Sequence, residues 1–395
     1  MVPSIRNRTA VVGTAFSEVA RRSTRSVGEL ATEAALRAIE DAGLSVGDID
    51  GLCVYPNPSR LGGTPLDGQD YVSRRYMTHA LGTPDIRWSA SVQPGSTVGS
   101  LIEAANALHA GACRYVLIWR AMHNPRGAYG TYGSAQAHGP EQFRAPYGLA
   151  NVVMDFALPY SRYQALYGAT REQMATFVVA NRQRALGNPD AVFRDSPLTV
   201  ADYLADPMIA SPLSRLDCDM PVDGCGAVVL TTAERARDLR HRPAYVRGYA
   251  SGGGQTARWA PTVTLGGLRD SAGHVARTLW EHTGLGPTDL EQINLYDGFS
   301  FFIYLWLEAL GFCALGEAGR FLQGPDTAPG GRWPLNTNGG ALGMGRLHGM
   351  PQIVEAVRQV QDRCGSRQVA DATHTLAISG NAGNACAAVV FSREP

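Results

Sequence analysis

The chain has 395 residues and a formal net charge of zero, because 35 Lys and Arg residues balance 35 Asp and Glu residues. Only 18% of the residues are charged. A nucleic-acid or anionic-membrane partner would favour a basic face, so we predict neither partner. The most apolar run, residues 299–315, carries Glu308 in its middle and predicts a buried helix rather than a membrane span. No basic and apolar signal region opens the chain, so we expect a cytoplasmic protein.

Seven cysteines are scattered along the chain, and no two have the Cys-x-x-Cys spacing of a zinc site or a redox motif. We therefore predict no metal site, and a reducing compartment is the simplest account of so many unpaired thiols. Cys386 lies in an apolar run typical of a buried strand, and we interpret it as a small packed side chain.

The first part of the chain alternates buried strands with helices. Ser26 is a favourable N-cap, and Glu29 lies in the first turn of the helix that follows it. We expect strands at residues 9–16 and 51–55, a helix at residues 26–42, and a loop with short helical pieces at residues 56–86.

A loop, a helix and a strand follow one another twice along the chain. The first helix begins near Val98 and precedes a strand at 115–119, and the second covers 351–363 and precedes a strand at 375–379. The repeated pattern predicts a duplicated unit whose two helices begin near one cleft. We place one half at residues 1–240, with an inserted loop region at 121–215 that is helical at 170–185, and the other half at 241–395.

The loop before the second helix, residues 331–350, has five glycines in its second half, at positions 339, 340, 343, 345 and 349, around Arg346 and His348. Glycine lets the backbone take positive φ and approach a ligand closely. A glycine-rich loop that leads into a helix N-terminus can bind an anion or a developing oxyanion. The alternative is a tight connection with no ligand, and the loop alone leaves both interpretations open.

Four motifs taken together resemble the thiolase superfamily, in the thiolase-like branch related to sterol-carrier-protein thiolases, and the match runs nearly end to end. The resemblance implies an α/β fold of duplicated βαβαβαββ halves in five αβαβα layers, a homodimer, and a coenzyme A or carrier-protein thioester as substrate, with no tightly bound cofactor. It places Asn338, Gly339, Gly340 and Gly380 in loops that bind the thioester. The motifs are Leu216-Asp-Cys-Asp-Met-Pro-Val-Asp-Gly224, Tyr296-Asp-Gly-Phe299, Asn336-Thr-Asn-Gly-Gly340 with His348-Gly349, and Ile378-Ser-Gly-Asn-Ala-Gly383.

This chain departs from the family pattern where a thiolase carries its nucleophile. The nucleophilic cysteine of that family begins the helix near Val98, whereas this chain has Ser96 there. A cysteine-free subset of the branch resembles retro-aldolases that cleave a β-hydroxyacyl-CoA together with a DUF35-type partner, which carries a zinc ribbon and an OB fold. Those aldolases have a tyrosine at the position of Arg346.

The resemblance to these aldolases suggests a role for each candidate side chain. Tyr296 would be the acid/base, with its pKa lowered by a nearby cation, and His348 would donate a hydrogen bond to the thioester oxygen. Arg346 would hold an oxyanion. Asp297 would either orient the site or cap the apolar helix that follows it.

Three functions remain open from the residues. Retro-aldol cleavage comes first. The second is acyl transfer or Claisen condensation, with Ser96 as the nucleophile if a base activates it, or with no covalent intermediate. The third is a non-catalytic subunit that supports a partner. Ser96 as a simple turn or cap residue would weaken the serine route, because serine strongly favours helix caps.

Overall fold

The computed structural model describes residues 5–55, 65–83, 85–92, 96–123, 142–143, 145–149, 151–252, 263–380 and 386–395. In these residues nine strands form one sheet, in the order β3-β2-β4-β7-β1-β8-β11-β10-β9. The first half supplies β1 (Thr9–Phe16), β2 (Gly51–Val54), β3 (Trp88–Ser91), β4 (Tyr115–Met122) and β7 (Gly224–Thr232). The second half supplies β8 (Ala244–Gly252), β9 (Gln292–Asn294), β10 (His374–Ser379) and β11 (Cys386–Ser392).

The two halves repeat the same strand pairings. β2 pairs parallel with β4, β4 antiparallel with β7, and β7 antiparallel with β1. In the same order, β9 pairs parallel with β10, β10 antiparallel with β11, and β11 antiparallel with β8. Even the parallel pairing of β2 with β3 has a counterpart, a single bridge between Ile293 and Leu335. The half-sheets join where Ala10 and Val11 of β1 meet the start of β8.

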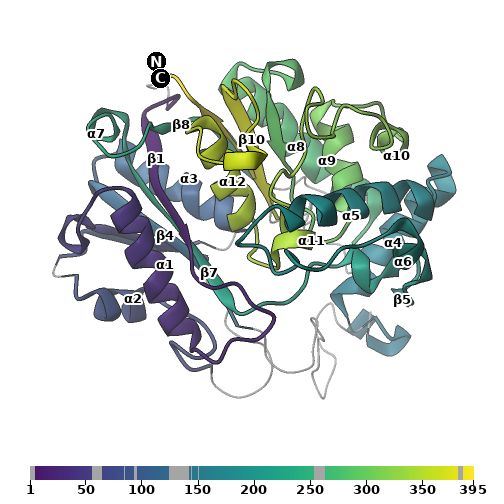
Figure 1. Cartoon of the computed structure of the whole chain (residues 1–395), viewed down its shortest axis with the longest axis horizontal. Helices are drawn as coiled ribbons and strands as arrows, with labels where there is room; N and C mark the ends of the chain where they lie inside the picture. Colours follow the sequence, from purple (N-terminus) through teal and green to yellow (C-terminus); the bar gives the residue numbers. More distant parts are fainter. Residues whose placement is uncertain are drawn as a thin grey trace.

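Helices separate the half-sheets and cover their outer faces, which gives the five predicted layers (Figure 1). α3 (Ser96–His109) and α12 (Met350–Val360) lie between the half-sheets and contact strands of both. α1 (Val27–Asp41) covers the outer face of the first half-sheet, near α2 (Arg74–Leu81). α8 (Leu265–Thr283) covers the second and contacts α9 (Phe302–Leu310). Three hydrophobic clusters fill the spaces between these layers.

Local sequence accounts for several of these helix ends. The side chain of Ser26 accepts a hydrogen bond from the amide of Glu29, and the Glu29 carboxylate accepts one from the amide of Ser26, so α1 begins with a capping box. α9 is shorter than the apolar run that predicted it, because Gly311 ends it in the left-handed region. β4 extends to Met122, three residues beyond the predicted strand. Arg120 therefore belongs to the strand.

The inserted region carries more helix than the sequence indicated. α5 (Arg171–Leu186) is the predicted helix. α4 (Val152–Tyr167) was not predicted, since Pro159 lies in its middle and proline usually ends a helix. α6 (Val200–Ala205) and a hairpin of β5 (Met208–Ala210) and β6 (Leu213–Ser214) follow. Residues 124–141, in the first part of the insertion, lie outside the described residues.

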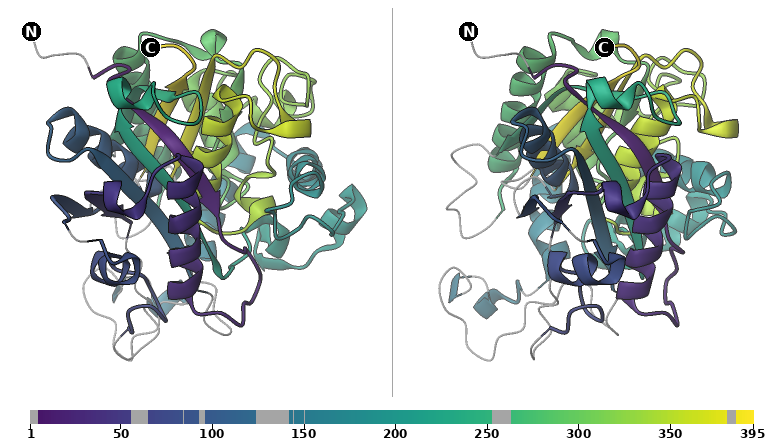
Figure 2. Two further views of the ribbon diagram at one scale, coloured as in Figure 1. Left: turned by 60° about the vertical axis from the view of Figure 1, so that its left-hand side comes forward. Right: turned by 90° about the vertical axis from the view of Figure 1, so that its left-hand side faces the viewer.

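Two views rotated from Figure 1 show the same layers from the side (Figure 2). Three short helices complete the described elements: α7 (Ala233–Ala236), α10 (Ala318–Phe321) and α11 (Gly340–Met344). The second series of elements begins with β8 at Ala244, close to the division predicted at residues 240 and 241. In the described part of the chain, no helix has the length and apolar character that crossing a bilayer requires.

Candidate active site

The predicted loops meet at a cavity of about 170 Å³ between the halves. Of the candidate residues, Ser96, Tyr296, Arg346, His348 and Gly380 line it. One wall is apolar, and the other carries hydroxyl, carboxylate, guanidinium and imidazole groups. The remaining lining residues are Tyr55, Val152, Phe156, Asp219, Gly298, Phe299 and Phe302.

The polar wall is organised around the carboxylate of Asp219, which is 1% exposed. The hydroxyl of Tyr296 donates to Asp219 Oδ2 over 3.4 Å. On the other oxygen, Arg346 Nε lies 3.3 Å from Asp219 Oδ1. A buried carboxylate requires such a cation and hydrogen-bond donor nearby, because burying an unpaired charge is costly. The three side chains thus form one connected acid–base group facing the cavity.

A short backbone pairing holds Asp219 beside Tyr296. Cys218 and Phe299 form an antiparallel bridge, and the amide of Asp219 donates to the carbonyl of Gly298 over 3.0 Å. Asp217 anchors the same pairing from the core, since its carboxylate accepts from the hydroxyls of Ser300 and of a buried tyrosine, each over 2.6 Å. The two family motifs therefore join to build one part of the site.

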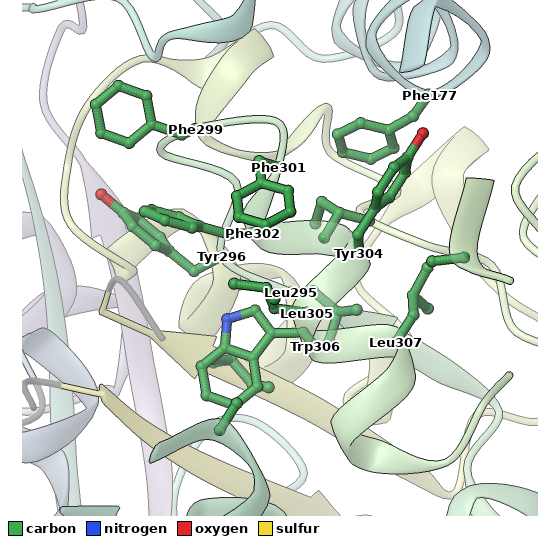
Figure 3. Packing of buried hydrophobic residues seen from close by; sticks show 14 of the residues in the cluster. Phe177, Leu295, Tyr296, Phe299, Phe301, Phe302, Tyr304, Leu305, Trp306 and Leu307 are labelled. Carbon is green, nitrogen blue, oxygen red and sulfur yellow. The ribbon is translucent and has the colours of Figure 1, made fainter. Parts of the chain in front are cut away.

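The Tyr296 ring packs in the largest hydrophobic cluster and points its hydroxyl out of that cluster (Figure 3). Its ring centroid lies 6.3 Å from that of Phe302, nearly parallel to it. A side chain on Gly298 would place its Cβ 2.5 Å from the Tyr296 hydroxyl, so only glycine leaves room for this arrangement.

The pKa predicted for Tyr296 was wrong in direction. Burial raises its pKa well above the usual value of 10, and the negative charge of Asp219 adds to the effect. Arg346 favours the phenolate, but its effect is smaller than that of burial, and Asp219 partly neutralises its charge. Tyr296 therefore remains a protonated phenol at neutral pH.

His348 is held from behind by a buried arginine. Arg120 of β4, which is 1% exposed, places Nη2 against His348 Nδ1 and donates through Nη1 to the carbonyl of Tyr55 over 2.8 Å. Its guanidinium lies over the Tyr55 ring, 4.5 Å from the centroid. Burial and the charges of Arg120 and Arg346 lower the pKa of His348 well below its usual value. The imidazole facing the cavity is therefore neutral.

Ser96 begins α3 and uses its hydroxyl structurally. Its Oγ donates to the backbone carbonyl of His348 over 3.2 Å, and Thr97 donates to the same carbonyl over 2.7 Å. The amide of Val98 is capped from the other half by Ser379 Oγ, over 3.0 Å. No base among the described residues is hydrogen-bonded to Ser96 Oγ. A carbonyl oxygen accepts a hydrogen bond but does not remove the hydroxyl proton.

Asp297 lies behind the cavity rather than on its wall. Its carboxylate is fully buried and accepts from the amides of Ala341 and Leu342 at the start of α11, over 2.6 and 3.2 Å. Asn181 and Gln352 also donate to it, over 2.7 and 3.1 Å. Burial raises its pKa to about 7. Asp297 thus accepts from the first amides of α11, whereas the sequence had left open whether it orients the site or caps the following helix α9.

Three of the four residues assigned to thioester binding also lie away from the cavity wall. Asn338 donates to the carbonyl of Pro351 over 2.9 Å, which ties the loop to α12. Gly339 packs against Ala185 of α5, and Gly340, at φ +63, leaves room for the Asp297 carboxylate. Close packing within the protein accounts for these two glycines. Gly380 alone of the four lines the cavity.

None of the cysteines is placed as a nucleophile. Burial raises the pKa of Cys53, Cys113, Cys313 and Cys386 to about 12. Cys386 begins β11, faces the core and donates to the carbonyl of Gly252 over 3.3 Å. A thiol with so high a pKa contains almost no thiolate at neutral pH.

Sequence reasoning missed three polar or aromatic residues on the polar side of this site, Asp219, Arg120 and Tyr55, and two of its apolar wall, Val152 and Phe156. Asp219 lies inside a quoted motif, and an alternation of two aspartates around Cys218 was its only signal. Arg120 interrupts the inward-facing apolar positions Val116, Ile118 and Met122 of β4, a pattern that the early strand end concealed. Among the described residues, no group of three or more His, Cys, Asp or Glu side chains is arranged to hold a metal ion.

Comparison with known proteins agrees with this geometry. Residues 258–393 match the family described as thiolase C-terminal domain-like. The chain is 34% identical to the 17-hydroxy-3-oxo-4-pregnene-20-carboxyl-CoA lyase of Mycobacterium tuberculosis, over 94% of this chain and 96% of that protein. It is also 34% identical to the steroid side-chain-cleaving aldolase of Thermomonospora curvata, over 94% of each chain. The solved structure described as the Ltp2-ChsH2(DUF35) aldolase superposes with a TM-score of 0.88 at 33% identity, over 99% of both chains.

The fold and the cavity define a thiolase-fold protein without a catalytic cysteine. The chain belongs to the thiolase superfamily, in the branch that includes sterol-carrier-protein thiolases and the steroid side-chain-cleaving aldolases. The predicted fold and family are therefore confirmed.

Proposed function

We propose that this chain is a C–C lyase that cleaves a β-hydroxyacyl-CoA thioester by a retro-aldol reaction without a covalent intermediate. One observation carries the proposal. The Tyr296 hydroxyl donates to one oxygen of the buried Asp219 carboxylate, and the Arg346 guanidinium lies beside the other oxygen. This group faces a cavity, and none of the described residues that line it is a cysteine. The names of the two relatives, a CoA lyase and an aldolase, support the same reaction class.

The proton of the β-hydroxyl leaves through Tyr296 to Asp219. As the phenol oxygen accepts the substrate proton, it passes its own proton to Asp219 Oδ2, so the phenol never needs to ionise alone. The β-carbon becomes a ketone as the bond between the α- and β-carbons breaks, and the electron pair moves into the thioester as an enolate. The same proton can then return to the α-carbon, which yields the shortened acyl-CoA and consumes no other reactant.

The enolate oxygen needs a donor, and His348 is placed to supply one. Its Nδ1 faces the Arg120 guanidinium, which has no lone pair to offer, so the neutral ring carries its proton on Nε2. No hydrogen bond is found for Nε2 in the described part of the chain. A preorganised donor of this kind commonly contributes about 10²–10³-fold to a rate.

The apolar wall suggests what the β-carbon carries. Phe156 packs against Phe299 and Phe302, with ring centroids 5.0 and 4.7 Å apart. Val152 extends this surface from the start of α4. An apolar group on the β-carbon would lie there, with its hydroxyl toward Tyr296. The steroid substrates named for the relatives have this character.

We further propose a DUF35-type partner and a homodimer in the cytoplasm. The partner is named in the Ltp2-ChsH2(DUF35) structure, and seven scattered, mostly buried cysteines suit a reducing compartment. Acyl transfer through Ser96 has less support, because its hydroxyl is used by the His348 carbonyl. A purely supporting subunit would have no need of the Tyr296–Asp219–Arg346 group.

The test is incubation of the purified chain, with and without a co-expressed DUF35-type protein, with tertiary β-hydroxyacyl-CoA and β-ketoacyl-CoA thioesters. We expect a ketone and a shortened acyl-CoA in equal amounts from the hydroxy substrates alone. Cleavage of β-ketoacyl-CoA only, with dependence on added coenzyme A, would contradict the proposal and favour thiolase chemistry.

A further inference from the structure

Arg120 is a buried cation without a carboxylate partner. It lies on an inward-facing position of β4, is 1% exposed, and makes no ion pair with any described Asp or Glu. Its Nε has no hydrogen-bond partner among the described residues either. Arginine is rarely buried in this state, because burying an unpaired charge is expensive. Burial lowers its pKa to about 10, which still leaves it charged at neutral pH.

The contacts that Arg120 does make all lead to the cavity. Nη2 meets His348 Nδ1, Nη1 meets the carbonyl of Tyr55, and the guanidinium lies over the Tyr55 ring. The Tyr55 and His348 rings also touch, with centroids 5.7 Å apart. A purely structural arginine would bond to core carbonyls alone, whereas this one presents its charge to the Nδ1 atom of an imidazole.

We propose that Arg120 is a positioning residue that fixes His348 as the Nε2–H tautomer and holds that donor toward the substrate's thioester oxygen. The proposal rests on the proposed function for the identity of the oxygen, but not for the tautomer. A guanidinium has donors only, so a ring in contact with it through Nδ1 must carry its proton on Nε2. Which nitrogen is protonated sets what an imidazole can do in a site.

Arg120 also strengthens the donor it orients. Its positive charge lies beside the imidazole and favours electron flow away from Nε2–H, which makes that hydrogen a better partner for an enolate oxygen. In a site closed to water such an interaction is worth more than in solution. The charged and titratable groups around His348 are Arg120 from β4, Arg346 from its own loop, Tyr55 after β2, and the Tyr296–Asp219 pair.

The first readout is the protonation state of His348, measured by NMR of the full-length protein labelled with ¹⁵N-histidine. The His348 signals are identified by their loss in His348→Gln. We expect a single neutral Nε2–H tautomer that does not titrate between about pH 6 and pH 9, because its pKa is lowered. In Arg120→Met we expect a mixture of tautomers and a pKa that moves up toward about 6.5.

The second readout is turnover, which links the tautomer to the reaction. Arg120→Met should lower kcat by roughly 10- to 1,000-fold with little change in KM, as for loss of a donor that acts in the transition state. Arg120→Lys keeps a charged donor and should recover part of kcat. Arg182→Met is the matched control, since Arg182 is also buried, has no carboxylate partner, and does not line this cavity.

The outcomes separate this inference from the proposed function. An Nδ1–H tautomer in the wild type, or a wild-type tautomer and kcat in Arg120→Met, would overturn the role of Arg120. If no β-hydroxyacyl-CoA is cleaved, the NMR result still decides the tautomer while the proposed function fails alone. If Arg120→Met does not fold, the wild-type tautomer and the kcat of Arg120→Lys decide whether Arg120 positions His348.

Discussion

The two repeated helices of the central layer begin beside the same cavity but contribute different chemistry to it. At the start of α3, the hydroxyls of Ser96 and Thr97 both donate hydrogen bonds to the carbonyl of His348. Before α12, Arg346 and His348 present charged and imidazole groups to the cavity. A thiolase-like arrangement would place its nucleophile at the first of these positions. In this chain the first loop supports the second, and the proposed reacting groups Tyr296 and His348 come from the second half, with the carboxylate of Asp219 from the first.

The largest loss of activity is expected from removing the hydroxyl of Tyr296, which belongs to the second half. Tyr296→Phe removes only the hydroxyl that bonds to Asp219, and it should lower kcat by about 10²–10⁴-fold, the usual reach of general acid–base catalysis. Tyr304→Phe is a matched control, because the Tyr304 hydroxyl is buried in the same cluster without a hydrogen-bond partner. Steady-state kinetics of both variants make the measurement. Equal activity in the two would remove Tyr296 from the reaction.

The same phenol gives a prediction for pH. The pKa of Tyr296 is raised and that of His348 is lowered, so neither group changes its charge between about pH 7 and pH 9. We therefore expect kcat to be flat over that range. An apparent pKa near 8 that disappears in Tyr296→Phe would mean that the phenol ionises, and that the relay to Asp219 is wrong.

Replacing Arg346 tests whether its positive charge stabilises the folded protein as well as taking part in the proposed reaction. Arg346→Met leaves the Asp219 carboxylate buried without its cation, and losing one partner of a buried pair costs about 3–5 kcal/mol. Because Arg346 is 18% exposed, we expect the lower end of that range or somewhat less. Arg320→Met, which breaks a pair between exposed side chains, should cost less than about 1 kcal/mol. Chemical denaturation of each variant gives the free energy of unfolding, and equal losses would contradict this account.

Replacing Asp297 should lower the stability of the second half without lowering kcat, which distinguishes a structural residue from a catalytic one. In Asp297→Asn one oxygen becomes an NH₂ group that faces amide donors, and each unsatisfied buried donor costs about 1–3 kcal/mol. The free energy of unfolding should fall by that amount while kcat per folded molecule stays within a few-fold. Asp195→Asn, on an exposed side chain, is the control. A large loss of kcat with unchanged stability would make Asp297 catalytic.

Ser96 should show the smallest effect. Ser96→Ala removes one hydrogen bond to the His348 carbonyl, which is worth about 0.5–1.5 kcal/mol, and Thr97 retains the second one. We expect kcat to change by less than about threefold. A fall as large as that of Tyr296→Phe would restore the serine as a nucleophile and reverse the comparison between the loops.

The sequence predicted the fold well because strands, caps and glycines act locally. The capping box at Ser26 and the repeated loop–helix–strand order needed no long-range information. The sequence predicted the residues of the cavity less completely, because neither Asp219 nor Arg120 can be recognised as a site residue before its neighbours in space are known. Asp219 becomes a site residue only when residues 217–219 pair with 298–300. Arg120 does so only when β4 faces the loop before α12.

The error on Tyr296 has a similar origin. A nearby cation was correctly expected, but no feature of the sequence indicated that a carboxylate would lie between the cation and the phenol. Burial and Asp219 together outweigh Arg346, and the pKa of Tyr296 rises. Likewise, Asn338, Gly339 and Gly340 suggested a ligand loop, whereas their neighbours in space are α12, α5 and Asp297.

The central claim is that C–C cleavage proceeds without an acyl-enzyme. The most direct test is to mix the protein and its DUF35-type partner with a tertiary β-hydroxyacyl-CoA, quench during turnover, and record the intact mass of the chain together with both products. We predict equal amounts of ketone and shortened acyl-CoA and a protein mass that stays unchanged throughout. A transient mass increase equal to the acyl group, located on Ser96 or on any cysteine, would contradict the account.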